Sequence, residues 1–484
     1  MYNKQTFLQI IKTQNPHFRL DKIAEAYDFC CLAHHGQKRK SGEPYVIHPI
    51  EVALEVSRLN IDEISIISAL LHDVIEDTSF TKEDIEKKFS KEVANVVEGV
   101  TKLDKIRFQE KHIRQVENFR KLFLALSKDI RVLIIKLCDR VHNMRTIEWQ
   151  KEEKQKIISL ETLEIYAPLA ERIGLQRIKN ELQDLSFKVL YPNEYKNITK
   201  QLEAIKKDFL TEHLVEDVEE QLRNTLYEFR IRARVFGREK MPYSIWNKMT
   251  KNHLRFEEIS DIFAFRIIVS NTEDCYRALG AIHTSYNAVP GKFKDFISIP
   301  KSNGYRSLHT KIIGPKGHII DIQIRTQSMH DEDEFGLASH WKYKQGLTHE
   351  DKMKCLRATW INRVLKILKE SNTDDIINDA KTEIQEKRII AFTHSGGVID
   401  LPYKSKILDF AFTIDDKLGL YFDYAIVNGQ QVGFDYTIQN GDKISVFTAR
   451  HPQVSSMWLN YVITGRARNA IIDYLSQENS QSNN

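Results

Sequence analysis

The chain has 484 residues, 42% of them hydrophobic, with 71 Lys and Arg against 67 Asp and Glu. This core fraction excludes disorder over most of the chain, and about 150 residues per domain suggests roughly three domains. The net charge of +4 excludes a uniformly basic surface, so any nucleic-acid patch has to be local. Five cysteines without a CxxC spacing disfavour a disulfide framework and fit a reducing cytoplasm. No apolar run reaches the roughly 18 residues of a membrane span, and no membrane partner is expected.

The first half of the chain is predicted to be helical. Apolar residues recur at helical spacing over residues 63–77, 130–144, 161–190 and 194–230. Thr81 and Asp84 have the spacing of a capping box, which predicts a helix start. The N-terminal part is therefore expected to be all-α.

Strand patterns begin later in the chain. Alternating residues predict strands over 230–236, 261–269 and 319–325. A charged helical connector over 347–387 then leads to short strands and Gly-containing turns over 388–448. Residues 476–484, rich in Ser, Gln and Asn, are expected to be disordered. The fold class that follows is multi-domain α + α/β.

Imidazole and carboxylate groups recur in the helical half. The candidates for metal binding are His48, then His72 and Asp73 followed by Glu76 and Asp77, and then Asp139 followed by His142 and Asn143. Such a mixed donor set suits a divalent ion such as Mn, Fe or Zn. Placing these groups on apolar helices is costly unless they are paired or bind a metal, so the set favours a metal site.

Further polar residues lie four positions from these ligands. The pairs are His72 with Glu76, Asp73 with Asp77, and Asp139 with Asn143. Residues four apart lie on one face of a helix, so each pair is expected to share a face. Glu76 and Asp77 would then reach a water molecule on the metal.

The middle of the chain combines cationic side chains with acidic strands. Asp261 opens one predicted strand, and strand period places Asp321, Gln323 and Arg325 on one face of another. Phosphoryl transfer needs magnesium held by carboxylates, and cations around the phosphates. Asp261 and Asp321 could hold magnesium, and Tyr305 could stack on a base. The alternative for such a region is a solvated, charged surface.

Longer strings in both regions resemble the RelA/SpoT family of the stringent response, whose hydrolase belongs to the HD phosphohydrolase superfamily. The strings are RKSGEPYVIHP, LLHDVIEDT and CDRVHNMRT in the helical half, and GREKMPYSIWNKM, DIFAFRIIV, GKFKDFISIPKSNGYRSLHT and DIQIRT in the middle. Residues 389–448 resemble the TGS domain, a small β-grasp. The resemblance covers nearly the whole chain, from about residue 20 to about residue 464.

The resemblance implies an all-α HD-type hydrolase that removes pyrophosphate from (p)ppGpp with Mn²⁺. Its metal ligands would be His48, His72, Asp73 and Asp139, and Glu76 and Asp77 would be catalytic. The family's contacts to the guanine nucleotide match Arg39, Lys40, Ser41 and Asn143.

It also implies a (p)ppGpp synthetase with a nucleotidyltransferase-like mixed sheet. ATP would be bound by Arg238, Lys240, Ser244, Lys248 and Arg266, and Mg²⁺ by Asp261. GDP or GTP would be bound by Lys294, Lys301, Asn303, Tyr305, His309 and Gln323, and Asp321 would help activate the 3′-hydroxyl. The family usually has Glu at the position of Asp321, so the side chain that is one methylene shorter predicts weakened synthesis.

The expected domains are the hydrolase domain (1–195), the synthetase domain (196–345), a helical linker (346–386), the TGS domain (387–449), and the start of a helical domain with a disordered tail (450–484). In the family the TGS domain senses uncharged tRNA on the ribosome. Here residues 413–420 lack the family's usual histidines and contain Asp415 and Asp416, which disfavour a phosphate backbone. A domain-packing role is the alternative. The family's usual zinc-finger-like and ACT domains have no counterpart in these residues, so the chain is expected to be C-terminally short.

Three functions remain open from the sequence. The first is a bifunctional enzyme acting on ppGpp, pppGpp, GDP, GTP and ATP. The second is a hydrolase whose synthetase is weak because of Asp321. The third is a stress regulator that binds tRNA or the ribosome without catalysis.

Overall fold

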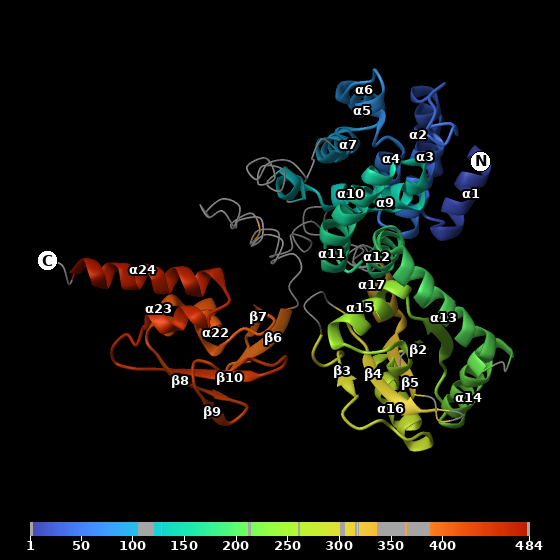
Figure 1. Cartoon of the computed structure of the whole chain (residues 1–484). Coiled ribbons are helices and arrows are strands. Elements are labelled where there is room, and N and C mark those ends of the chain that lie inside the picture. The colour runs from blue at the N-terminus through green and yellow to red at the C-terminus, as the bar shows by residue number, and fades with distance from the viewer. Residues whose placement is uncertain are drawn as a thin grey trace. The chain divides into compact units, whose positions relative to one another are not determined.

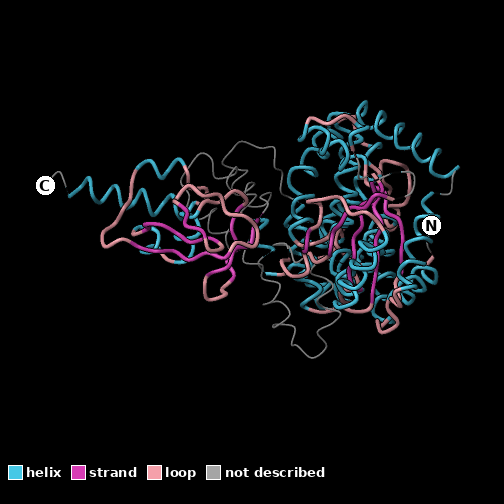
Figure 2. The backbone as a smooth tube through the Cα atoms, turned by 90° about the horizontal axis from the view of Figure 1, so that it is seen from below, coloured by secondary structure: helices cyan, strands magenta, loops and turns pink. Residues whose placement is uncertain are grey.

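The computed structural model describes residues 3–104, 121–126, 128–211, 214–259, 262–300, 305–314, 317, 319–335, 364 and 388–481. The chain forms two compact units, one of residues 1–293 and 308–385, the other of 294–307 and 386–484. Figure 1 labels the elements of both, and Figure 2 shows strands in both units. Among the described residues, no helix combines the length and apolar character needed to cross a membrane. The helical linker expected over 346–386 lies outside the described residues, apart from Val364.

The N-terminal part of the first unit is entirely helical where it is described. Its α-helices are α1 (Lys4–Gln14), α2 (Leu20–Ala33), α3 (Ile47–Arg58), α4 (Glu63–Leu70), α5 (Val74–Asp77), α6 (Lys82–Lys88), α7 (Lys91–Asp104), α9 (Ile130–Arg145), α10 (Glu152–Glu161), α11 (Ala167–Arg172) and α12 (Gln176–Leu190). They enclose one apolar core that includes Ile23, Val52, Leu70, Leu133 and Leu182. The capping box at Thr81 and Asp84 is confirmed at the start of α6.

The single helix expected over residues 63–77 is wrong, because the chain turns between α4 and α5. The ring Nδ1 of His72 lies 2.8 Å from the carbonyl oxygen of Ala69. Since a carbonyl can only accept, Nδ1 donates to Ala69. This bond turns the imidazole inward at the break, so His72 lies in the turn and Asp73 is the N-cap residue of α5.

The helix expected over residues 161–190 is also interrupted. A π-helix at Thr162–Tyr166 separates α10 from α11, and Gly174, with φ of 79°, ends the run before α12. A glycine fits this conformation because it has no Cβ. Helix α12 then contacts α9 on one side and α15 (Pro242–Asn252) and α17 (Gln327–Phe335) on another.

Helices α13 (Pro192–Thr211) and α14 (Leu214–Glu228) lead into the sheet of the first unit. Its strands in this unit are β1 (Arg234–Glu239), β2 (Phe263–Val269), β4 (Leu308–Ile313) and β5 (Ile319–Thr326), in the order β1-β2-β5-β4. β2 and β5 are parallel and the other pairs antiparallel, so the sheet is mixed as expected. The first strand starts later than predicted, because Arg230 has a φ of 58° and turns the chain after α14.

The two faces of this sheet differ in chemistry. Ile320, Ile322 and Ile324 of β5 are buried, whereas Asp321 and Gln323 between them are half-buried. Helix α16 (Thr272–Ser285) contacts β2, β4 and β5. The alternation leaves a polar face on which β2, β4 and β5 can carry functional side chains.

The second unit contains a β-grasp-sized sheet, which confirms the small β domain expected near the C-terminus. Its strands are β6 (Arg388–Thr393), β7 (Val398–Pro402), β8 (Phe422–Val427), β9 (Gln430–Val432) and β10 (Lys443–Thr448), in the order β7-β6-β10-β8-β9. Helices α22 (Ile407–Ile414) and α23 (Asp416–Leu420) lie between β7 and β8 along the chain. The short strand β3 (Lys294–Asp295) also belongs to this unit.

The residues after 450 share the core of this β domain. Trp458 and Ala467 are buried in one cluster with Phe410 and Phe412. Helix α24 (Gly465–Gln481) extends through Ser476, so the expected disorder is wrong for residues 476–481. Residues 482–484 lie outside the described part of the chain.

Asp409 of α22 joins the two parts of this unit. Its carboxylate is fully buried and accepts hydrogen bonds from the backbone N–H groups of Lys406 (2.8 Å), Ile463 (2.9 Å) and Thr464 (2.7 Å). One side chain thus satisfies the start of α22 and the segment before α24. A buried backbone donor without a partner is costly, so these contacts hold the two segments together.

We expect Asp409→Asn to loosen both segments. The amide nitrogen of Asn cannot accept, so at least one of the three N–H groups loses its partner, at a cost of about 1–3 kcal/mol. Amide hydrogen exchange of the full chain at Lys406, Ile463 and Thr464 measures the effect. Asp423→Asn, on the exposed side of β8, is the matched control. Unchanged exchange at all three amides would contradict the assignment.

Candidate functional site

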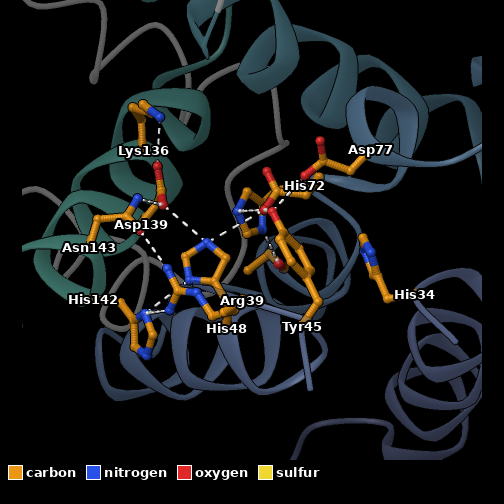
Figure 3. Close-up of polar contacts among 12 residues, drawn as sticks. His34, Arg39, Tyr45, His48, His72, Asp77, Lys136, Asp139, His142 and Asn143 are labelled. Carbon is orange, nitrogen blue, oxygen red and sulfur yellow. Dashed lines mark hydrogen bonds and ion pairs between the residues drawn. The ribbon is translucent and has the colours of Figure 1, made fainter. Parts of the chain in front are cut away.

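Three ligand-type side chains meet in the helical core of the first unit. His48 comes from α3, His72 from the turn between α4 and α5, and Asp139 from α9. One donor atom of each lies within 4.8 Å of the others, and each residue is at most 3% exposed. Figure 3 shows the three side chains pointing toward one another. The sequence-predicted ligands are therefore brought together from elements far apart in the chain.

The protonation of the two imidazoles leaves one nitrogen of each for a cation. His72 donates through Nδ1 to Ala69, and its buried Nε2 has no hydrogen-bond partner. Arg39 lies 3.0 Å from Nδ1 of His142 and can only donate, so that nitrogen accepts. His48 Nδ1, 2.9 Å from the same atom, must then carry a hydrogen. Both Nε2 atoms can thus present a lone pair.

Carboxylates face these two nitrogens. Nε2 of His48 lies 3.2 Å from Asp139 Oδ1 and 3.5 Å from Asp73 Oδ2, and Nε2 of His72 lies 3.2 Å from Asp73 Oδ2. Once Nε2 of His72 has lost its proton, both Nε2 atoms would offer a lone pair to a divalent cation lying between these carboxylates. The donor set therefore fits a divalent metal.

Asp139 is held from both sides along its own helix. Lys136 donates to Oδ2 at 2.6 Å, and the amide of Asn143 donates to Oδ1. Burial raises the pKa of Asp139, but Lys136 and His48 outweigh it and hold the pKa well below its usual range. The carboxylate is therefore ionised and fixed in direction, as a metal ligand requires.

The charges around Asp73 and His72 favour their ionised forms. Burial lowers the pKa of His72, but the carboxylates of Asp73 and Asp139 raise it to about 9. Burial raises the pKa of Asp73, but His72 and His48 bring it below its usual range. At neutral pH a cation that binds here has to displace a proton from His72.

The two predicted catalytic carboxylates lie on α5 and are exposed. Asp77 comes close to Asp73, because the hydroxyl of Tyr45 contacts both (2.6 Å to Asp77 Oδ2 and 2.8 Å to Asp73 Oδ2). Glu76 is one residue earlier on the same turn. His72 and Glu76 were expected to share a helix face, but they do not lie on one helix, because α5 starts after His72.

The predicted nucleotide contacts lie beside this cluster. Arg39 donates to Asn143 at 2.9 Å and Lys40 donates to Gln150 at 2.8 Å, while the Ser41 hydroxyl lies 3.3 Å from Glu43. These contacts place the loop that carries Arg39 and Lys40 against the end of α9 and the residues after it. The loop thus borders the metal-ligand cluster.

The sequence reasoning missed two residues at this site, Tyr45 and Lys136, and it gave no role to His142. Lys136 and His142 lie three positions before and after Asp139, which places them on its face of α9. That spacing could have identified them. Tyr45 gave no such signal, because it precedes α3 and reaches Asp73 and Asp77 only in the folded chain.

Part of the predicted synthetase set forms a row across the sheet. Arg266 of β2 is in register with Gln323 of β5, which is in register with His309 of β4. Asp321 pairs with Lys311 in the next row on the same face. The strand register thus brings together Arg266, His309, Gln323 and Asp321.

Helix α17 supplies partners to the arginines of this face. Arg266, 6% exposed, donates to Glu334 at 3.0 Å, and Arg325 donates to Asp333. His330 lies near Arg266, and burial and the two guanidinium groups lower the pKa of this histidine to about 4. His330 is therefore neutral at pH 7.

The other predicted synthetase residues lie on β1 or directly after it, on α15, in the second unit or outside the described residues. Lys240 follows β1, and Ser244 and Lys248 lie on α15. Lys294 and Tyr305 belong to the second unit, where the rings of Tyr305 and Phe296 meet edge to face with 6.0 Å between their centroids. Asp261, Lys301, Asn303 and the side chain of Arg238 lie outside the described residues.

We expect His72→Gln to weaken binding of Mn²⁺, used as a probe, to the metal-free chain. Loss of a buried ligand should cost at least the roughly 10–100-fold seen for outer partners of metal ligands. Calorimetric titration measures it, with the exposed His35→Gln as matched control. Equal affinity of both variants would contradict the assignment of His72 as a ligand.

We expect His330 to make stability fall as the pH drops from 6.5 toward 4. The unfolded chain binds a proton there with an ordinary pKa near 6.5, whereas the folded chain does not until about pH 4. In urea unfolding of the first unit, His330→Gln should reduce this loss. An unchanged pH slope would show that His330 does not stay neutral.

Comparison with known proteins identifies matches along the chain. The pattern of the HD domain matches residues 26–176, that described as "Region found in RelA / SpoT proteins" matches 237–348, and that of the TGS domain matches 389–448. Together these matches cover the helical core, the mixed sheet and the small β domain.

Curated relatives resemble almost the whole chain. "Bifunctional (p)ppGpp synthase/hydrolase SpoT" of Escherichia coli is 39% identical over 469 residues, covering 97% of this chain and 66% of that protein. "GTP pyrophosphokinase" of Myxococcus xanthus is 41% identical over 475 residues, covering 97% and 62%. The chain thus spans about two thirds of the length of these relatives.

A solved structure described as "A metazoan ortholog of SpoT hydrolyzes ppGpp and plays a role in starvation responses" is 27% identical and covers 34% of this chain and 94% of its own. Its TM-score to this chain is 0.28. The three domain matches and the identity to the curated relatives show that this chain belongs to the RelA/SpoT family.

Proposed function

We propose that this protein is a bifunctional alarmone enzyme. One activity hydrolyses (p)ppGpp to GDP or GTP and pyrophosphate with Mn²⁺. The other transfers pyrophosphate from ATP to the 3′-hydroxyl of GDP or GTP with Mg²⁺. The names of the relatives support both activities, and the chain carries both matching domains.

The hydrolase half rests on the buried cluster of His48, His72 and Asp139. With Asp73, these residues would hold the Mn²⁺. When bound, such an ion acidifies water and withdraws charge from a phosphoryl oxygen. In the reaction a water oxygen bonds to the phosphorus on the 3′-oxygen, and the bond between that phosphorus and the 3′-oxygen breaks.

The protein's own side chains would manage the proton and the substrate charge. The water loses a proton and the 3′-oxygen gains one, so a carboxylate near both can accept and return it. Asp77, held beside Asp73, is suited to this role, with Glu76 as its neighbour. Arg39, Lys40, Ser41 and Asn143, at the edge of the cluster, would contact the guanine nucleotide.

The synthetase half rests on the polar face of the first sheet. Arg266 would bind ATP together with Arg238, Lys240, Ser244 and Lys248. His309 and Gln323, in one row with Arg266, would bind the acceptor with Lys294, Lys301, Asn303 and Tyr305. Asp261 would hold Mg²⁺, and Asp321 would accept the proton of the 3′-hydroxyl while that oxygen attacks the β-phosphorus of ATP and AMP leaves.

A hydrolase with a weak synthetase is the second candidate. It is favoured by Asp321, which is shorter than the Glu usual in the family at this position. A misplacement of about 1 Å can cost on the order of a hundredfold in rate. A regulator without catalysis is disfavoured by the buried donor cluster, which is costly without a bound cation.

Binding of tRNA or the ribosome through the TGS domain stays a proposal. Asp415 caps α23 through the N–H groups of Lys417 and Leu418, and Asp416 pairs with Arg466 at 3.0 Å. Both carboxylates thus have local partners, which supports a packing role for this segment.

The cysteines that the structure describes, Cys30, Cys31, Cys138 and Cys275, are free thiols, which supports a reducing compartment such as the cytoplasm.

We expect Asp73→Ala and Tyr305→Ala to separate the two activities. Asp73→Ala should lower ppGpp hydrolysis at least about a hundredfold and spare synthesis. Tyr305→Ala should do the reverse, because loss of stacking on a base costs about 1–3 kcal/mol. Ion-exchange chromatography of nucleotides measures both. Hydrolysis that survives Asp73→Ala would refute the metal assignment.

We expect Asp321→Glu to discriminate between the first two functions. If the short side chain limits synthesis, the longer one should raise the rate of ppGpp formation up to about a hundredfold. Hydrolysis of ppGpp by the same variant is the internal control, and it should not change. A wild-type chain that synthesises well, with no gain in the variant, would remove the second candidate.

A further inference from the structure

The hydroxyl of Tyr45 lies between two carboxylates with different assigned roles. Its oxygen is 2.8 Å from Oδ2 of Asp73, beside the two histidines, and 2.6 Å from Oδ2 of Asp77 on α5. Figure 3 shows Tyr45 beside Asp77. Two like charges this close repel each other, so a neutral group that contacts both lowers the cost of the arrangement.

The ring of Tyr45 is itself held in place. It stacks on His34 with 4.9 Å between ring centroids and an interplanar angle of 27°. The backbone N–H of Tyr45 donates to the carbonyl of Gln37 at 2.9 Å. His34 is buried, so the phenol is supported by a rigid surface and not by solvent. Its hydroxyl is therefore pre-set in direction.

The same segment also holds the backbone of Asp77. The amide nitrogen of Gln37 donates to the carbonyl oxygen of Asp77 at 2.7 Å. The other end of that amide, Oε1, lies 2.8 Å from Nδ1 of His34, which fixes which way the amide points. Asp77 lies at the end of α5, a helix of four residues that cannot hold its last side chain by itself. Gln37 and Tyr45 thus supply the restraint.

A phenol has one hydrogen and can donate to only one carboxylate at a time. The hydroxyl of Tyr45 therefore donates its hydrogen bond to Asp73 and to Asp77 in turn. Tyr45 thereby connects a group that would hold the metal to a group that would handle the proton.

We propose that Tyr45 is a positioning residue of the hydrolase site, which fixes Asp77 beside Asp73 through its hydroxyl. This inference rests on the hydrolase activity proposed above. It assigns a role to a residue that does not have to touch the substrate. A structural role of Tyr45 would depend on the ring alone, because the ring makes the stacking contact.

The test is Tyr45→Phe in the full chain, because this change removes the hydroxyl and keeps the ring. At saturating Mn²⁺, kcat for ppGpp hydrolysis should fall about tenfold or more, with KM changed less than about twofold. The melting temperature should stay within a few degrees of the wild type. Tyr27→Phe is the matched control, since Tyr27 is a buried tyrosine of α2 that packs on Phe7.

A second readout does not need turnover. In calorimetric titration of the metal-free variant with Mn²⁺, the dissociation constant should rise about tenfold, because Asp73 loses a partner that orients it. The Tyr27→Phe control should bind Mn²⁺ like the wild type. This measurement reports on Asp73, whereas kcat at saturating Mn²⁺ reports on Asp77.

An unchanged kcat or an unchanged Mn²⁺ affinity in Tyr45→Phe would overturn the bridging role, and so would an equal loss in Tyr27→Phe. In each case the wild-type chain still hydrolyses ppGpp, so the proposed function stands. If the wild-type chain does not hydrolyse ppGpp with Mn²⁺, the proposed function fails first. The inference about catalysis then fails with it.

Discussion

The candidate metal centre depends on the ion pairs that the buried carboxylate of Glu55 makes with two arginines. Glu55 is 2% exposed and accepts hydrogen bonds from Arg145 (2.9 Å) and Arg177 (2.7 Å), and Arg145 in turn donates to Glu181. Burial raises the pKa of Glu55, but the two guanidinium groups outweigh it and lower the pKa. Loss of either guanidinium group would leave the buried carboxylate with fewer partners, so these contacts join the three helices firmly.

Those helices are the ones that matter for both candidate sites. Glu55 shares α3 with His48, and Arg145 shares α9 with Asp139, so the network fixes the spacing of two proposed ligands. Helix α12 carries Glu181 and continues to Asp184, whose carboxylate accepts the backbone N–H of Tyr243 at the start of α15. α15 carries Ser244 and Lys248 of the proposed synthetase site. One continuous set of contacts therefore links the helices of both sites within the first unit.

The two sites solve the problem of buried charge in different ways. In the helical core, Lys136 neutralises Asp139, and the remaining donors are oriented so that a cation completes the balance. On the sheet, α17 supplies Glu334 and Asp333 to Arg266 and Arg325. The first arrangement leaves a place for a metal, whereas in the second each guanidinium group is already paired with a carboxylate of α17.

The cluster of His48, His72 and Asp139 could be predicted as a candidate metal site from the sequence, because these residues lie in strings whose residue types and order suit such a site. The strand alternation likewise placed Asp321 and Gln323 on one face, since side chains alternate along a strand whatever its neighbours are. Helix spacing misled at His72, where the chain turns between α4 and α5, and over residues 161–190, where a π-helix and Gly174 interrupt the run.

Other features exist only in the folded chain. The register that places Arg266 beside Gln323 and His309 depends on how three strands pair, and Tyr45 reaches Asp77 across 32 positions. Asp409 likewise holds Ile463 and Thr464 from 54 and 55 positions away, which joins α24 to the β domain. The amino-acid sequence by itself determined the residue types, their local spacing and the family. Only the tertiary structure decided which of these residues hold one another, because contacts between distant segments follow from packing and not from local periodicity.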